Sequence, residues 1–359
     1  MQLPIRRHTR SIQIGPRFIG SQHPILVQSM TVAKPSQTDT CLEEIHRLES
    51  VGCDLIRVAI PDMASAKAVK ILKQASSVPL IADIHFDPDL ALEVIDQGID
   101  KIRLNPSNIK DPGRIREIVQ AAHQSHIPIR VGANAGSVKM EGNQTLIEAL
   151  FQALEKEVAL LESLDFHQIV LSAKCSSIEL NWKLNQLIAS RFNYPIHLGL
   201  TEAGLLAPGI VQTTLSLSSL LQAGIGDTIR FSLSGELEQE VNAGKALLQA
   251  LGMRQGVRII ACPMCGRSRW DVQANAEKVT KALSNLDQPL TIAIMGCEVN
   301  GPGEAREADF GLAGSGAFVV YFEKGEILDK GTPEEMLKKL LHTVQNQSGF
   351  AASKAMKRR

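Results

Sequence analysis

The sequence predicts an α/β protein in which a (β/α)8 TIM-like barrel is followed by a small α+β domain. Short apolar runs alternate with amphipathic stretches between residues 25 and 233, which is the pattern of alternating strands and helices. Several runs begin at a proline, a residue tolerated at the first position of a strand. After about residue 245 the alternation gives way to a different order of elements, which indicates a second domain.

The apolar runs have the length of single buried strands. The segments between them, such as 36–52 and 62–77, carry apolar residues at helical spacing. Repeated strand–helix units over this length are typical of a (β/α)8 barrel, although a doubly wound open sheet remains an alternative. The expected barrel strands are residues 25–30, 55–60, 79–84, 101–105, 128–134, 168–174, 195–200 and 228–233.

Domain limits follow from the change of pattern. We expect the barrel to occupy residues 1–252 and to end with a helix over 236–252. A second domain over 256–347 contains strands at 256–263, 290–297, 317–322 and 326–329, and helices at 272–286 and 333–345. The remaining residues, 348–359, end in a basic run and are expected to form a disordered tail.

Composition excludes several classes of protein. The chain has 359 residues, and its 38 basic and 38 acidic side chains give a formal net charge of zero, which argues against a nucleic-acid or membrane-surface binder. No apolar run is long enough to span a membrane, and no apolar region follows the N-terminal arginines as in an export signal. We therefore expect a cytoplasmic protein.

Polar residues stand at the carboxyl ends of the expected strands, where barrel enzymes place their catalytic groups. A single arginine there can be a rim or capping residue, but basic residues on five strand ends converge on one mouth. Arginine forks suit phosphate oxygens, and no nucleotide-binding glycine loop is present, so the expected ligand is a phosphate or diphosphate ester. The candidate substrate-binding residues are Arg57, Arg103, Asn105, Arg130, Asn134, Lys174, His197, Arg230 and Ser232. Glu202 and His85 are the candidate acid/base residues at this mouth.

The second domain contains the most specific motifs. Cys262 and Cys265 form a CPMC motif directly after an apolar strand, and Cys297 ends the next strand in the phrase IMGCEVNGPGEA. Thiolates on adjacent strand ends can share one metal centre. Glu304 is the candidate fourth ligand and a candidate catalytic residue. A structural zinc site and buried unligated thiols remain alternatives.

The other cysteines, Cys41, Cys53 and Cys175, lie apart from those motifs and are expected to be small core residues. Six cysteines are also too few and too unevenly spaced for a disulfide framework.

The sequence resembles one family closely, through phrases spread over the chain from about Arg6 to the terminal helix. They are VQSMT (27–31), ADIHFD (82–87), KIRLNPSNI (101–109), IPIRVGANAGS (127–137), HLGLTEAG (197–204), GIGDTIRFSL (224–233), ACPMCGRSRWDV (261–272) and GCEVNGPGEA (296–305). The family is the 4-hydroxy-3-methylbut-2-en-1-yl diphosphate synthases of the non-mevalonate isoprenoid pathway. The paired cysteine motifs are specific to it. One minor departure is a shorter chain between Gly136 and Leu146 than in many relatives.

This resemblance implies a two-electron reductive ring opening and dehydration of 2-C-methyl-D-erythritol 2,4-cyclodiphosphate to 4-hydroxy-3-methylbut-2-enyl diphosphate. It implies a metal-binding oxidoreductase with a 4Fe-4S cluster on Cys262, Cys265, Cys297 and Glu304, reduced by flavodoxin or ferredoxin. It also implies a homodimer. Two alternatives remain: a non-redox barrel enzyme of the phosphosugar aldolase or pterin synthase type with a structural zinc domain, and a non-catalytic iron–sulfur sensor or scaffold.

Overall fold

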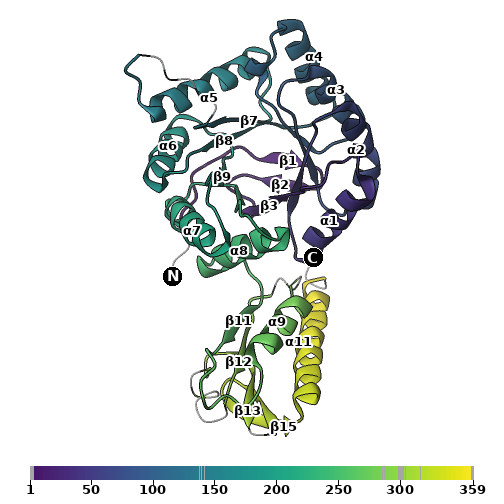
Figure 1. Ribbon diagram of the computed structural model, residues 1–359, viewed down its shortest axis with the longest axis vertical. Helices are drawn as coiled ribbons and strands as arrows, with labels where there is room; N and C mark the ends of the chain where they lie inside the picture. Colours follow the sequence, from purple (N-terminus) through teal and green to yellow (C-terminus); the bar gives the residue numbers. More distant parts are fainter. Residues whose placement is uncertain are drawn as a thin grey trace. The chain divides into compact units, whose positions relative to one another are not determined.

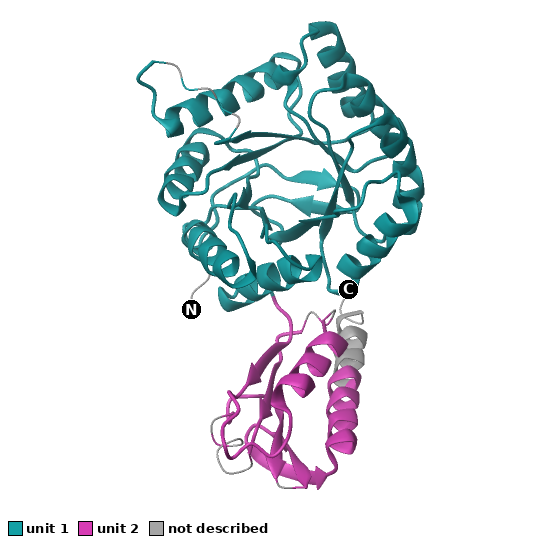
Figure 2. Cartoon of the chain, in the orientation of Figure 1, with its two compact units in different colours: residues 1–254 teal, residues 255–359 magenta. Residues whose placement is uncertain are grey.

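The computed structural model describes residues 4–136, 138, 140, 142–284, 286, 288–297, 303, 305–315 and 317–356, with side chains described as far as residue 346. The chain divides into two compact units, residues 1–254 and 255–359 (Figure 2). The expected domain limits, 1–252 and 256–347, stay predictions. None of the helices in the described ranges is long and apolar enough to cross a membrane.

The first unit is a barrel of parallel strands in the order β8-β7-β6-β5-β4-β3-β10-β9. A bridge between Leu171 and Ile196 joins the two ends of this order, so the sheet is nearly closed. The prediction of a (β/α)8 barrel is confirmed. The barrel strands are β3 Leu26–Met30, β4 Leu55–Ala59, β5 Leu80–Asp83, β6 Lys101–Arg103, β7 Ile129–Asn134, β8 Ile169–Lys174, β9 His197–Gly199 and β10 Thr228–Arg230.

An outer ring of helices surrounds these strands (Figure 1). Their starts are marked by side chains that accept a hydrogen bond from the first turn, among them Asp62, Asp111 and the capping box of Thr145 with Glu148, which satisfies amide groups that a helix leaves unpaired. The helices are α1 Thr38–Ser50, α2 Met63–Ala75, α3 Pro88–Asp96, α4 Pro112–Gln124, α5 Leu146–Ser163, α6 Ile178–Arg191, α7 Leu206–Gln222 and α8 Leu237–Ala250, with a 3₁₀ turn η1 at Pro106–Asn108.

A short antiparallel hairpin seals the amino-terminal end of the barrel. Its strands, β1 Ile12–Ile14 and β2 Arg17–Ile19, are joined at Gly15, whose φ of +53° is a left-handed conformation that glycine adopts easily. Its buried isoleucines pack on apolar residues at the strand starts. The sequence did not predict this hairpin, because three-residue strands give almost no periodic signal.

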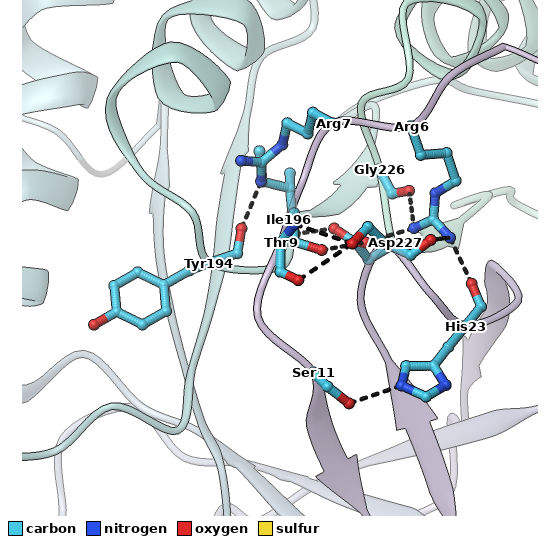
Figure 3. A network of polar contacts seen from close by, with 10 residues as sticks. Arg6, Arg7, Thr9, Ser11, His23, Tyr194, Ile196, Gly226 and Asp227 are labelled. Carbon is cyan, nitrogen blue, oxygen red and sulfur yellow. Dashed lines mark hydrogen bonds and ion pairs between the residues drawn. The ribbon is translucent and has the colours of Figure 1, made fainter.

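A polar network ties the N-terminal segment to the same end of the barrel (Figure 3). Buried Asp227 accepts hydrogen bonds from Arg6, from the Thr9 hydroxyl at 3.2 Å and from the Ile196 amide at 2.8 Å. Arg7 donates to the carbonyl oxygens of Phe192 and Tyr194. Burial raises the pKa of Asp227, and the amide and the two arginines oppose that shift. These bonds position the chain ahead of β1.

The second unit is a five-stranded mixed sheet in the order β11-β12-β13-β14-β15. The first three strands are parallel, and β14 and β15 are antiparallel additions. The helices α9 and α11 pack on one face of the sheet through a shared apolar core (Figure 1). The elements are β11 Arg258–Ala261, α9 Val272–Ala282, β12 Thr291–Met295, β13 Phe310–Ser315, β14 Phe318–Glu323, β15 Glu326–Gly331 and α11 Pro333–Met356.

Two features of this unit differ from the sequence-based expectation. Strand β13 was not predicted, because its glycines obscure the apolar pattern. Gly311 is needed there, since a side chain would collide with the Phe322 ring at 2.1 Å. Helix α11 extends to Met356, into the segment that was expected to be a disordered tail.

Candidate active site

The carboxyl ends of the barrel strands enclose a cavity of about 310 Å³. Among the described residues that line it, basic side chains outnumber carboxylates. Of the barrel residues predicted from the sequence, all except Asn105 and His197 line this cavity. Its lining consists of Arg57, Asp83, His85, Arg103, Arg130, Gly132, Asn134, Ser172, Lys174, Leu200, Thr201, Glu202, Arg230 and Ser232.

Asp83, the last residue of β5, lies close to two of the arginines. Its carboxylate oxygens lie 3.9 Å from Arg57 Nε and 3.7 Å from Arg103 Nε, and His85 Nε2 lies 3.7 Å away. Burial raises the pKa of Asp83, but the nearby His85 imidazole and the charges of Arg57, Arg103 and Arg130 outweigh it and hold the pKa below its usual range. Asp83 therefore stays ionised and orients the arginines without neutralising all of them.

Arg130 and Lys101 lie deeper and are less compensated. Arg130 is 3% exposed, and its Nε and Nη1 have no hydrogen-bond partner in the described part of the chain. Lys101, fully buried on β6, likewise leaves its Nζ without a described partner. Burial, followed by the charge of Arg57, lowers the pKa of Arg130; burial, followed by Arg130 and Arg57, lowers the pKa of Lys101. Among the described residues Asp83 Oδ1 is unpartnered as well, but the unpartnered donors of this cluster outnumber it and favour the binding of an anion.

Lys101 was not predicted as a site residue, because a lysine at the start of a strand is usually solvated. A signal was available: Lys101 and Arg103 are two positions apart on one strand, so they share a face.

The remaining arginine of the cavity, Arg230, is paired. Glu240 on α8 is 3% exposed and lies 3.2 Å from Arg230 Nε. It also accepts hydrogen bonds from the Ser29 hydroxyl at 2.8 Å and the Leu233 amide at 3.0 Å. Glu240 was not predicted from the sequence, although a glutamate beside Val241 on the buried face of α8 is unusual.

Lys174 and His197, two of the residues predicted from the sequence, contact each other. Lys174 ends β8 and lines the cavity, whereas His197 on β9 is fully buried and does not line it. The two side chains meet at 3.3 Å, between Lys174 Nζ and His197 Nε2. Burial, followed by the charges of Arg130, Arg57 and Arg230, lowers the pKa of Lys174, with Glu240 opposing.

Asn105 lines a neighbouring cavity of about 550 Å³, which shares His85, Arg103 and Asn134 with the first. Its amide is already engaged: Nδ2 donates to the Gly132 carbonyl at 2.6 Å and Oδ1 accepts from the Gly132 amide at 3.0 Å. Asn105 thereby continues the pairing of β6 with β7 beyond the last ladder residue.

Glu202 follows β9 in an exposed loop at the cavity. Its φ of +57° is uncommon for a residue other than glycine, and such outliers cluster at functional sites. Its carboxylate is accessible to a ligand in the cavity, as an acid/base group requires.

In the second unit the three candidate ligand cysteines follow two neighbouring parallel strands. Cys262 comes directly after β11 and Cys297 shortly after β12, and the register pairs Ala261 with Ile294. All three thiols are free, and the Gly296 amide donates to Cys262 Sγ at 3.0 Å. Hydrogen bonds from Arg267 lower the pKa of Cys265, which favours its thiolate form.

The thiols therefore fit a thiolate-bound metal centre in their chemistry and in their placement after adjacent strands. Among the described residues, no three possible ligand side chains form a group that could hold a metal ion. Glu304 lies outside the described residues. Cys41, Cys53 and Cys175 are buried in the barrel unit, and burial raises the pKa of each thiol.

Comparison with known proteins decides the family. Residues 9–245 match the family model described as the GcpE TIM-barrel domain, and residues 258–346 match the GcpE protein C-terminal domain. The chain belongs to the GcpE family.

Relatives in this GcpE family carry the name that the motifs predicted. The protein named 4-hydroxy-3-methylbut-2-en-1-yl diphosphate synthase (flavodoxin) from Caldanaerobacter subterraneus subsp. tengcongensis is 45% identical over 96% of this chain and 98% of its own. The protein of the same name from Caldicellulosiruptor saccharolyticus is 45% identical over 94% of this chain and 98% of its own. The predicted family is confirmed, and the non-redox alternative finds no support.

Solved structures agree on the fold. A 3-dehydroquinate dehydratase from Geobacillus kaustophilus superimposes on 68% of this chain and 97% of its own with a TM-score of 0.50 and 13% identity. At that identity the likeness concerns the barrel architecture alone.

Proposed function

We propose that the chain catalyses the reductive ring opening and dehydration of 2-C-methyl-D-erythritol 2,4-cyclodiphosphate to 4-hydroxy-3-methylbut-2-enyl diphosphate. The name shared by its relatives supports this reaction, and that name also gives flavodoxin as their electron donor. The chemistry consumes two electrons and two protons and releases one water. The chain is thus an oxidoreductase acting on a CH or CH2 group, with flavodoxin, or alternatively ferredoxin, as its partner.

The observation that supports the substrate most directly is the uncompensated positive charge at the barrel mouth. Arg130 offers buried N–H groups without described partners, and Arg57 and Arg103 share a single carboxylate, Asp83. Guanidinium forks bind phosphate oxygens in pairs of charge-assisted hydrogen bonds. A cyclic diphosphate carries one negative charge on each phosphorus and can complete this cluster.

Apart from His197, which is buried and does not line the cavity, the proposed substrate-binding residues are those predicted from the sequence. Their roles follow from their positions. Arg57, Arg103, Arg130, Lys174 and Arg230 attract the diphosphate. The carboxylates Asp83 and Glu240 orient the arginines. Asn134 and Ser232 line the same cavity, and Asn105 shapes its wall through Gly132.

Proton transfer is assigned to Glu202 and His85. Both line the cavity, and His85 lies beside Asp83. Opening the ring and releasing a hydroxyl group as water requires a proton at the departing oxygen. A carboxyl or imidazole group at the mouth can supply it.

We assign a 4Fe-4S cluster to Cys262, Cys265, Cys297 and Glu304. When bound, this cluster supplies electrons one at a time. Free thiols at the ends of adjacent strands, and the Gly296 amide directed at Cys262 Sγ, support the assignment. Amide hydrogen bonds to ligand sulfurs are one means by which proteins tune cluster potential.

The test is turnover of the cyclodiphosphate by anaerobically reconstituted protein with a chemical reductant, together with its visible spectrum. Cys262→Ser, Cys265→Ser and Cys297→Ser should each lose most iron and all turnover, because a hydroxyl is a poor iron ligand. The buried barrel cysteine Cys41 provides the matched control, and Cys41→Ser should keep both. A colourless, zinc-containing wild-type protein would refute the redox function.

Glu304 has a separate test. Glu304→Ala should still assemble some cluster on the three thiolates but lose turnover. Glu304→Cys should hold a tighter, all-thiolate cluster and be nearly inactive, because a carboxylate is more easily displaced by substrate oxygen. Robust turnover by Glu304→Cys would refute the ligand role and favour a loop-capping role, which is worth only about 1 kcal/mol.

We further propose that the enzyme acts in the cytoplasm as a homodimer, as the family resemblance implies. Sedimentation of the reconstituted protein tests the dimer. A monomer that retains full turnover would refute it.

A further inference from the structure

One contact beneath the mouth is not explained by substrate binding alone. Lys174 Nζ lies 3.3 Å from His197 Nε2, and the other ring nitrogen, Nδ1, lies 2.8 Å from the Thr228 hydroxyl. His197 and Thr228 are direct register partners on the neighbouring strands β9 and β10. All three side chains are buried. They form a short chain of hydrogen bonds that ends at the cavity.

The chemistry of the groups determines the direction of these bonds when an anion is bound. A lysine ammonium donates and cannot accept, so Nε2 must offer its lone pair. Nδ1 then carries the proton and donates it to Thr228 Oγ1. A doubly protonated ring is disfavoured: burial, followed by the charges of Lys174, Arg130, Lys101 and Arg57, keeps the pKa of His197 well below its ordinary value.

On the same face of β9 as His197, the ammonium lies close to bare backbone. Gly199, two residues after His197, has no side chain, and a Cβ there would lie 2.8 Å from Lys174 Nζ and 3.0 Å from its Cε. Real Cβ atoms do not approach so closely. The imidazole contacts the ammonium, and the absence of a side chain at Gly199 leaves the room that this position of the ammonium requires.

We propose that His197 is a positioning residue, which acts through Lys174 by holding the ammonium in the direction of the substrate's diphosphate, with Thr228 fixing the tautomer. The inference rests on the proposed function. It also reassigns the expected role of His197, from direct contact with substrate to control of the residue that makes the contact.

A double-mutant cycle tests this role in the full-length reconstituted protein, with inorganic pyrophosphate and the cyclodiphosphate as probes in titration calorimetry. His197→Leu should weaken binding about tenfold in the wild-type background, the usual effect of losing one charge-assisted bond. In the Lys174→Met background the same change should have almost no effect. Equal losses in the two backgrounds would overturn the positioning role.

Two milder variants keep the test decisive if His197→Leu does not fold. His197→Gln retains an acceptor for the ammonium and should bind within about threefold of wild type, while Gly199→Ala should displace the ammonium and weaken binding only when Lys174 is present. A Gly199→Ala effect that persists in Lys174→Met would also overturn the inference. Failure of the wild type to bind either probe would instead refute the proposed function.

Discussion

Arginines stand at both ends of the barrel, but their side chains are partnered differently at the two ends. At the amino-terminal end, Arg6 donates to the carbonyl oxygens of His23 and Gly226 and to Asp227. Arg7 donates to the carbonyl oxygens of Ala189, Phe192 and Tyr194 and leaves only Nε without a described partner. At the carboxyl-end cavity, Arg130 leaves two nitrogens unpartnered within the described ranges; deeper in the barrel, at the start of β6, the Nζ of Lys101 is also unpartnered there.

This difference indicates that the partnered arginines stabilise the fold, whereas the unpartnered side chains bind a ligand. Buried charges that hold a fold together are paired and hydrogen-bonded, because an uncompensated buried charge costs several kcal/mol, about 3–5 when one partner is removed. Charged side chains without a partner of opposite charge at the strand ends lower the stability of the fold. They are typical of sites where a bound ligand supplies the opposite charge. The paired end should therefore control stability, and the unpaired end should control affinity.

The largest change in the free energy of unfolding should come from removing the carboxylate that pairs with Arg6 at the amino-terminal end. Asp227→Asn replaces a shared acceptor by an amide that cannot satisfy Arg6, Thr9 and the Ile196 amide together. We expect the free energy of unfolding to fall by about 3 kcal/mol, with pyrophosphate affinity unchanged. Denaturant unfolding measures the first quantity and calorimetry the second. The exposed Asp165→Asn should change stability by less than about 0.5 kcal/mol.

Replacing arginines of the cavity at the carboxyl end should lower the affinity for the ligand and leave stability unchanged. Arg57→Met and Arg130→Met should each weaken binding of the cyclodiphosphate by about one to two decades, the value of a charge-assisted bidentate pair. Folding and the cluster spectrum should be intact. The control is Arg116→Met on the exposed face of α4. If affinity survived in both cavity variants, the phosphate-binding role of the mouth would be wrong.

The last effect concerns Lys101, whose replacement should raise the free energy of unfolding instead of lowering it. Between its low folded pKa and its ordinary value of 10.5, the unfolded chain binds the extra proton, so the free energy of unfolding should rise with pH in that window. Lys101→Met removes an unpartnered buried group and should stabilise the protein at pH 7 by about 1–3 kcal/mol, while weakening pyrophosphate binding. Urea unfolding at pH 7 and pH 9 checks both signs. Destabilisation by Lys101→Met at pH 7 would show that Lys101 is compensated in the resting protein.

The sequence was sufficient for the barrel because alternation of apolar runs and helical stretches is a local pattern. It also located the strand-end arginines, since the fold itself brings those ends together. Glu240 and Lys101 were missed because their importance depends on burial against residues distant in the chain. The burial of His197 also depends on the geometry of the closed barrel, which the sequence does not give. The Asp227 network was not predicted because it joins residues some 220 positions apart.

The most direct test of an anion-completed mouth is the number of protons taken up when the cyclodiphosphate binds. Each phosphate of this ligand has one ionised oxygen and does not titrate near pH 8, so any uptake belongs to the protein. Calorimetry in two buffers of different ionisation enthalpy measures it. We predict binding with net proton uptake in wild type, because the anion raises the lowered pKa values of Lys101 and Lys174, and a smaller uptake in Lys101→Met. Binding with no buffer dependence, or no binding, would contradict the claim that the mouth carries incomplete charge awaiting a diphosphate.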